Sequence, residues 1–322
     1  MDFDLSDDQV ALVDGLRSML GGRFDRPCVR SMIDAGLHRG RWRELGDTGV
    51  FSMTVAVADG GVGLGWVEAA LTFEELGRSL VPGPLVATTL AATLRPALAD
   101  GGTVVGLVEA SGGALVVEHW PALDQLILVD AEAIWLIDDL EAIPAIVEPR
   151  PLDPLTPVAR IESLPAGQQI GDASDSLMLR RRGAVLTSAL QLGLAVGALE
   201  LAVDYAKDRQ QFGRPIGSFQ AIKHLCADML GRVEVCRAAV YMAAVALDDP
   251  GAVDPDRAIS VARLLADESA GPNGKDCVQI HGGMGYTWEI DAHLYLKRAW
   301  VLESVFGSSD HHAEWLADSV LG

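Results

Sequence analysis

The chain has 322 residues, of which 25 are basic and 45 acidic, so its formal net charge is −20 at neutral pH. This charge argues against nucleic-acid binding, because phosphate contacts need clustered lysine and arginine. The one tight basic cluster, residues 180–182, is interpreted as a solvated helix start or a local anion contact. A hydrophobic content of 49% and a charged content of 22% are typical of a folded globular protein with room for two or three domains.

The four cysteines form no Cys-x-x-Cys pair, which argues against the common zinc and thioredoxin-like motifs. The opening segment is acidic where a signal peptide would be basic, so a cytoplasmic location is expected. Residues 183–199 carry no charge, but the stretch is short for a membrane span and contains Gly, Ser, Thr and Gln. We interpret it as a helix buried in a bundle and expect no membrane span.

Residues 1–100 are predicted to be mostly helical. Ser6 and Gln9 have the spacing of a capping box, and apolar residues follow at helical intervals. Further helices are predicted at residues 42–48, 66–78 and 84–98.

A glycine-rich run at residues 59–65 is weak evidence for a phosphate loop, because that motif needs a strand–turn–helix context and an acid about 20 residues later. A tight surface turn is the main interpretation. Glu74 and Glu75 come too early to be that acid and are assigned to a helix surface.

Residues 101–172 change character and are predicted to form a small antiparallel β domain. Short β-rich runs separated by turn residues occupy residues 103–108, 115–117, 125–129 and 134–137. The following segment is rich in acids and prolines, as expected of a partly extended boundary.

Residues 173–322 are predicted to be helical again. Long helices are predicted at residues 179–209, 218–248, 255–279 and 292–306, which is the pattern of a four-helix bundle. Pro272 falls inside the third of them and should kink it. The expected fold is α+β, mainly α, with an N-terminal helical domain (1–100), a small middle β domain (101–172) and a C-terminal four-helix bundle (173–322).

Two segments of the predicted bundle are candidates for chemistry. The first places Arg209 at a helix end, followed by Phe212 and a glycine turn; the alternative is a helix–helix corner with Phe212 as a core plug. The second places Gln279 before Gly282 and Gly283; the alternative is a helix cap and turn. Together they offer a guanidinium, an amide and bare backbone, a set suited to a pyrophosphate.

Two other patterns are weaker. His311 and His312 are adjacent, so on a helix they point about 100° apart, and no metal site is expected. Ser308 and Ser309 lack the Gly-x-Ser-x-Gly elbow of a hydrolase.

The sequence resembles acyl-CoA dehydrogenases over nearly its whole length. The resemblance rests on the opening Met-Asp-Phe-Asp-Leu-Ser-Asp-Asp-Gln, on Asp-Gly-Gly-Val-Gly at residues 59–63 with Phe-Glu-Glu-Leu-Gly-Arg at 73–78, and above all on two signatures. These are Arg-Gln-Gln-Phe-Gly at 209–213 with Phe-Gln-Ala-Ile-Lys-His at 219–224, and residues 279–287.

The resemblance implies FAD and the dehydrogenation of an acyl-CoA by removal of an α-proton and a β-hydride. In the family, the arginine of the first signature contacts the FAD pyrophosphate that a neighbouring subunit holds. The implied cofactor-binding residues are Arg209, Phe212, Gln220, Gln279, Gly282 and Gly283.

The sequence departs from the family where the chemistry takes place. The usual catalytic Glu is replaced by Phe306, which cannot accept a proton. Some members of the family place the catalytic base near the start of the first bundle helix instead. The corresponding residues here, 180–183, contain no acid. Glu303, one helical turn before Phe306, is a weak substitute, with a helix-surface acid as its alternative.

The loop that holds the flavin ring in the family has no match, and the middle domain looks shortened. This pattern implies a subunit of a heteromeric α2β2 enzyme that acts on bulky CoA thioesters such as sterol side chains, as in steroid degradation. Its partners would be a longer dehydrogenase subunit with the catalytic Glu and an electron acceptor. The alternatives are a structural or regulatory partner without FAD contact, or a self-sufficient dehydrogenase that uses Glu303.

Overall fold

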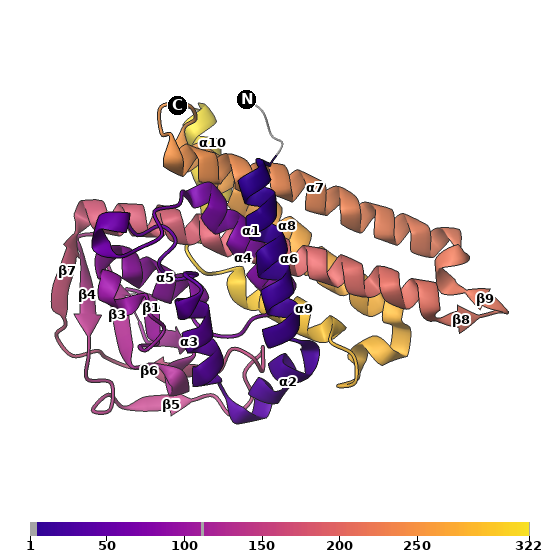
Figure 1. The fold of residues 1–322 in the computed structure, drawn as a ribbon, viewed down its shortest axis with the longest axis horizontal. Coiled ribbons are helices and arrows are strands. Elements are labelled where there is room, and N and C mark those ends of the chain that lie inside the picture. The colour runs from indigo at the N-terminus through magenta and orange to yellow at the C-terminus, as the bar shows by residue number, and fades with distance from the viewer. Residues whose placement is uncertain (1–4, 111–112, 322) are drawn as a thin grey trace. The chain divides into compact units, whose positions relative to one another are not determined.

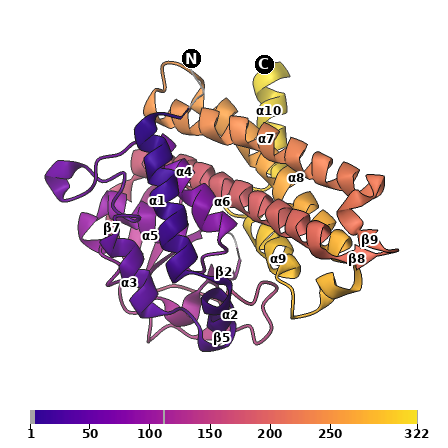
Figure 2. The ribbon, with the colours of Figure 1, turned by 45° about the vertical axis from the view of Figure 1, so that its right-hand side comes forward.

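The computed structural model describes residues 5–110 and 113–321, which group into two compact units. The helical unit contains residues 5–22, 70–81 and 184–321; the sheet unit contains residues 23–69, 82–110 and 113–183. The first four residues of the opening motif lie outside the described part of the chain. Figures 1 and 2 show the course of the chain through the elements of both units.

The helical unit is built from long helices, several of which extend beyond it. They are α1 (Asp7–Arg23), α4 (Trp66–Arg78), α6 (Ala173–Asp208), α7 (Gln220–Asp248), α8 (Pro255–His281), α9 (Ala292–Leu302) and α10 (Ser309–Leu321). The predicted capping box begins α1: the Ser6 N–H donates to Gln9 Oε1 at 3.0 Å, and the Gln9 N–H donates to Ser6 Oγ at 3.2 Å.

Helices α4 and α6 cross at backbone contact. A Cβ atom on Gly193 would lie 2.0 Å from the Glu74 carbonyl oxygen, and one on Gly77 would lie 2.2 Å from the Leu190 carbonyl oxygen. Only glycine allows this approach at both positions. Helix α6 is long and apolar enough to cross a membrane, but 89% of its most apolar 18-residue stretch is buried within the structure. The predicted burial of residues 183–199 is therefore confirmed.

The assignment of Glu74 and Glu75 to a helix surface is wrong. Glu74 is 5% exposed and accepts hydrogen bonds from Arg237 at 3.0 Å and from the Tyr241 hydroxyl at 2.7 Å. Glu75 is 2% exposed and pairs with Arg17 at 2.8 Å. These partners come from distant segments, which compensate the buried carboxylates.

Two helix boundaries differ from the prediction. Helix α6 begins at Ala173 because the Asp172 carboxylate accepts the N–H groups of Ser174 and Asp175. Helix α9 ends at Leu302, and a further helix, α10, follows; Phe306 lies between them with a left-handed φ of 55°, so no α-helix runs through this position. Helix α8 runs on through Pro272, so the proline does not end it.

The sheet unit combines short helices with two small sheets. Its helices are α2 (Arg26–Ala35), α3 (Arg39–Asp47) and α5 (Leu85–Leu94), and its strands are β1 (Val105–Glu109), β2 (Leu115–Glu118), β3 (Gln125–Val129), β4 (Ala133–Ile137), β5 (Ala145–Val147), β6 (Val158–Ile161) and β7 (Gln168–Asp172). One sheet has the order β1-β3-β4-β7 and the other β2-β6-β5. The glycine-rich run at 59–65 is a turn before α4, and residues 57–59 form a 3-10 helix.

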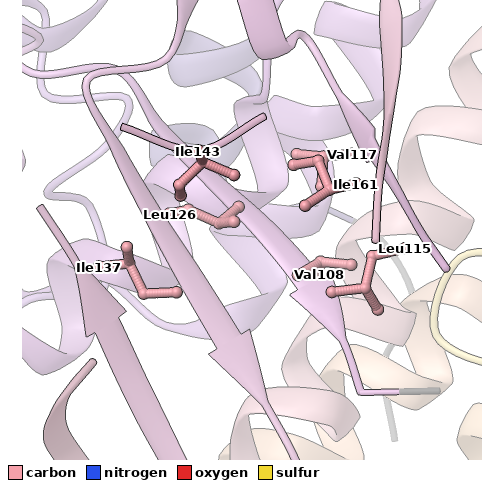
Figure 3. Packing of buried hydrophobic residues seen from close by; sticks show 7 residues of the cluster. All are labelled: Val108, Leu115, Val117, Leu126, Ile137, Ile143 and Ile161. Atoms are coloured by element: carbon pink, nitrogen blue, oxygen red, sulfur yellow. The ribbon is translucent and has the colours of Figure 1, made fainter. Parts of the chain in front are cut away.

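The sheets are not purely antiparallel, as the prediction had it: β1 and β3 pair in parallel. The intervening strand β2 joins the other sheet, so the chain returns to β1 by a crossover instead of a hairpin. Side chains from both sheets form one buried cluster (Figure 3). Its members are Val108, Leu115, Val117, Leu126, Ile137, Ile143 and Ile161.

The basic cluster at residues 180–182 lies inside α6 and makes local contacts. Arg180 pairs with Glu109 at 3.3 Å, and the Arg182 guanidinium lies 4.9 Å from the centre of the Trp66 ring. Of the two interpretations offered for the cluster, the local anion contact is the one that Arg180 supports.

Candidate functional site

A two-stranded hairpin connects α6 to α7 in the helical unit. Its strands are β8 (Gln210–Gln211) and β9 (Arg214–Pro215), and Figures 1 and 2 show it at the end of α6. Phe212 and Gly213 form the turn with φ of 53° and 76°, the signs that a two-residue type I′ turn requires. A left-handed phenylalanine is strained, and strained residues concentrate at functional sites.

Phe212 is 89% exposed, so the alternative of a core plug is wrong. Its ring instead meets the Phe219 ring edge-on, with 6.0 Å between centroids. The rigid turn therefore presents an aromatic side chain to the outside of the helical unit.

Arg209 stands between α6 and the hairpin. Its backbone N–H donates to Tyr205 O at 2.9 Å, and its carbonyl accepts from the Ile216 N–H at 2.8 Å. Its exposed guanidinium has neither a hydrogen bond nor an ion pair among the described residues. The backbone is thus fixed while the cationic group is available to a ligand outside this chain.

Gln220 is the first residue of α7 and is exposed. It follows a 3-10 turn, η4 (Ile216–Ser218), so its side chain lies where the free N–H groups of the helix N-terminus are concentrated. Such an end favours a negatively charged group.

The second signature lies at the end of α8. Gln279 is exposed on the last turn, and the 3-10 segment η5 (Gly282–Tyr286) follows. Gly282 and Gly283 are exposed, and a Cβ on either would have no other group within 4 Å. Their backbone is open to a ligand, whereas Gly285 packs against Val278.

One aromatic stack brings the two signatures together. The Tyr205 and His281 rings lie 4.1 Å apart with an interplanar angle of 26°. Tyr205 is one turn before Arg209, and His281 is two residues after Gln279. The spatial association of the two segments, which the sequence only implied, is present within the helical unit.

Phe306, which the resemblance places where the family has its catalytic Glu, is a buried side chain. Phe306 is 7% exposed, and its carbonyl accepts a hydrogen bond from His312 Nε2 at 3.1 Å. Burial lowers the pKa of His312, so its ring is neutral at pH 7 and Nδ1 accepts from the Ser260 hydroxyl at 3.1 Å. Both ring nitrogens of His312 are therefore used within the fold.

Arg263 is a structural residue that the sequence did not suggest. It is fully buried and donates to Gln191 Oε1 at 2.6 Å and to the Leu302 carbonyl at 3.1 Å. Longer bonds reach the carbonyls of Glu303 and Gly307. A lone arginine in a helical pattern carries no signal for such a role, because these partners come from two distant segments, α6 and residues 302–307.

Glu303 is half-buried, and burial together with the nearby Asp267 carboxylate raises its pKa. Its Oε1 lies 3.4 Å from the position that a Cβ on Gly271 would occupy. The predicted alternative of a plain surface acid does not describe this environment. Its carboxylate packs toward α8 within the helical unit.

The connection between β1 and β2 lies within residues 101–172, where the sequence has no match to the family's flavin-ring loop. Strand β1 ends at Glu109 and β2 begins at Leu115, and Glu109 is engaged by Arg180. Residues 111–112 of this connection lie outside the described chain. Among the described residues there is also no group of three or more His, Cys, Asp or Glu side chains placed to hold a metal ion.

Comparison with known proteins assigns both ends of the chain to one family. Residues 6–104 match the model of the acyl-CoA dehydrogenase N-terminal domain, and residues 177–321 match that of the C-terminal domain. IpdE2 of Mycolicibacterium smegmatis, an acyl-CoA dehydrogenase, is 33% identical over 307 residues, which cover 92% of this chain and 93% of IpdE2. The chain belongs to the acyl-CoA dehydrogenase family.

One further relative differs from this chain in length, and one solved structure shares its fold. Acyl-CoA dehydrogenase FadE34 of Mycobacterium tuberculosis is 36% identical over 93% of this chain, but the match covers only 45% of FadE34, so this chain spans less than half of that relative. The ChsE4–ChsE5 complex from Mycobacterium tuberculosis contains a chain with the same fold, with a TM-score of 0.86, 22% identity and coverage of 100% and 99%.

Membership of this family of flavoproteins brings FAD as cofactor. The residues of the helical unit fit part of it: an unpaired guanidinium, two exposed amides and an open glycine backbone suit the diphosphate. Arg209, Gln220 and Gln279 with the backbone of Gly282 and Gly283 would hold that part. Bound FAD supplies the acceptor for the hydride that leaves the acyl-CoA.

Proposed function

We propose that this chain is a subunit of an FAD-dependent acyl-CoA dehydrogenase, and that it contributes contacts to FAD held mainly by a second, longer subunit. The second subunit carries the catalytic Glu and the flavin-ring loop. The reaction is α,β-dehydrogenation of an acyl-CoA thioester. The proposed assembly is an α2β2 heterotetramer in the cytoplasm that passes its electrons to a separate acceptor.

One observation carries this proposal: the chain keeps the family's FAD-contacting residues but lacks its catalytic Glu. Arg209, Gln279 and Gly283 are exposed, and the side chains of Arg209 and Gln279 have no hydrogen bond or ion pair within the described chain. Phe306, at the position of the acid, is buried and cannot take a proton. A chain with this combination serves a site that another subunit completes.

The relatives support the proposal in two ways. IpdE2 matches this chain in length, whereas FadE34 is more than twice as long as the segment that matches it. A fold neighbour comes from the ChsE4–ChsE5 complex, and another is described as a steroid acyl-CoA dehydrogenase, Tcur3481–Tcur3483. We therefore assign the substrate to bulky CoA thioesters of the sterol side-chain type.

In this function the residues of this chain bind and orient FAD, and they do not transfer protons. Arg209 neutralises negative charge on the diphosphate, and Gln220 and Gln279 donate amide hydrogen bonds. The open backbone at Gly282 and Gly283 allows the close approach that a side chain would block. Phe212 adds a rigid aromatic contact next to Arg209.

The test is Arg209→Ala in the complex of both subunits. The variant should lower the flavin content of the purified complex without dissociating the subunits. Unchanged flavin content would favour the alternative of a structural or regulatory partner without FAD contact.

The environment of Glu303 keeps one enzymatic alternative open. Its raised pKa and position one turn before Phe306 are compatible with a base in a self-sufficient homomeric dehydrogenase. That alternative requires Glu303→Gln to abolish activity of the isolated chain while FAD stays bound. Our proposal expects the isolated chain to be inactive before and after the substitution.

A further inference from the structure

The hairpin after α6 carries a second arginine, Arg214, close to Arg209. Gln211 and Arg214 are paired across β8 and β9, and the Arg209 carbonyl bonds to the Ile216 N–H on the other strand. Arg209 immediately precedes β8 and bonds across the hairpin to Ile216, two residues after Arg214, so the two arginines lie near each other at the hairpin.

Arg214 packs on an aromatic ring and has no acidic partner in the described part of the chain. Its guanidinium lies 4.3 Å from the centre of the Phe219 ring, which Phe212 meets edge-on. It is exposed, and the described residues provide neither a hydrogen bond nor an ion pair to its side chain. Stacking on an aromatic face orients the planar group and leaves its edge N–H donors available.

This pairing is unusual for so acidic a protein. The net charge is −20, and many other arginines, including Arg17, Arg78 and Arg237, are tied to carboxylates. Two exposed arginines that have no ion-pair partner among the described residues lie at one short hairpin and give a local positive site. A ligand with two adjacent negative groups matches it better than a single phosphate does.

We infer that Arg214 is a second anion contact, which acts with Arg209 on the two phosphates of the diphosphate of FAD bound in the partner subunit. This inference rests on the proposed function. Arg209 engages one phosphate from the end of α6, and Arg214, fixed over Phe219, engages the other. The strained turn at Phe212 sets the spacing between the two strands that carry them.

The test uses the complex of this chain with its flavin-binding partner, stripped of FAD and retitrated. Arg214→Gln should weaken FAD binding by about tenfold, as expected for loss of one charge-assisted contact. Arg214→Lys should restore part of the affinity, because it keeps the charge but not the planar fork. Arg257→Gln is the matched control: Arg257 is exposed near the start of α8, at the opposite end from His281.

A second measurement compares ADP with AMP as competitors of FAD. The complex should prefer ADP, and Arg214→Gln should narrow that preference, which a purely structural role would not do. Circular dichroism of each variant checks that the helical fold is kept.

The outcomes separate the inference from the proposed function. If Arg209→Gln loses FAD while Arg214→Gln and Arg214→Lys behave as Arg257→Gln does, the inference is overturned and the proposed function stands. If Arg214→Gln weakens subunit association with no change in FAD affinity, Arg214 contacts a partner carboxylate and the inference is again wrong. If Arg209→Gln also matches the control, the proposed function fails.

Discussion

Replacing Arg263 by Met tests whether a buried charge network holds the segment around Phe306, residues 302–307. Methionine keeps most of the side-chain volume, so the change removes the charge and hydrogen bonds with little cavity. The Gln191 amide oxygen and the Leu302 carbonyl lose their donors at 2.6 and 3.1 Å. Asp267, 9% exposed and 3.7 Å from the Arg263 guanidinium, loses its nearby positive charge.

The expected loss in the free energy of unfolding follows from the burial and the partners of Arg263. Removing one partner of a buried ion pair typically costs about 3–5 kcal/mol, because the other charge is left uncompensated. Asp267 keeps donors from Gln191 and Ser309, which places the expected loss near the lower end, at about 3 kcal/mol. If the uncompensated charge is the main cause, Asp267→Asn in the Arg263→Met background should recover part of the loss.

Urea unfolding followed by circular dichroism measures this loss. Arg257→Met makes the same chemical change at an exposed site on α8, where a cost within about 0.5 kcal/mol is expected. A loss for Arg263→Met no larger than that of Arg257→Met would refute the reasoning.

Three further predictions concern strain, packing and pH. Phe212→Asn should leave the free energy of unfolding in urea unchanged or raise it by up to about 1 kcal/mol, because asparagine suits a type I′ turn. The flavin content of the complex should fall, and retained flavin would contradict the contact assigned between Phe212 and FAD. Gly193→Ala should lower the free energy of unfolding by about 2 kcal/mol or more, since its Cβ would lie 2.0 Å from the Glu74 carbonyl oxygen. Gly231→Ala, whose Cβ would have no other group within 4 Å, should cause no loss, and equal urea midpoints for the two variants would exclude the close helix crossing. Burial lowers the pKa of His312 from 6.5, so the unfolded chain binds a proton at a pH where the folded chain does not, and the free energy of unfolding should fall as the pH drops below 6.5. His312→Asn should reduce this pH dependence, and an unchanged slope would show that other groups cause it.

Sequence patterns predicted the parts of the fold that depend on local chemistry. Helix α4 has the predicted bounds, 66–78, and strand β3 has the predicted bounds, 125–129. In both, the apolar spacing and the flanking turn residues agree. The capping box of Ser6 and Gln9 is local in the same sense.

What the sequence missed depends on contacts between distant segments. The burial of Glu74 requires Arg237 and Tyr241, more than 160 positions away. The parallel pairing of β1 with β3 depends on β2 joining another sheet, which no local pattern encodes. Helix α10 was missed because the left-handed turn at Phe306 separates it from α9, and phenylalanine gives no sequence signal for such a conformation.

For the candidate site, the family signatures predicted which residues to examine, and the structure adds their environment. The exposed hairpin, the stack of Tyr205 on His281 and the second arginine at the hairpin follow from backbone geometry that the motifs do not specify. The roles of Arg209, Gln220 and Gln279 toward FAD remain predictions.

The flavin content of the purified chain, expressed alone and together with a longer acyl-CoA dehydrogenase subunit, tests the central claim most directly. We predict that the chain alone, supplied with FAD, is nearly colourless and inactive, and that the co-purified complex binds flavin and dehydrogenates an acyl-CoA. An isolated chain that holds a full complement of FAD and shows strong dehydrogenase activity would contradict the account.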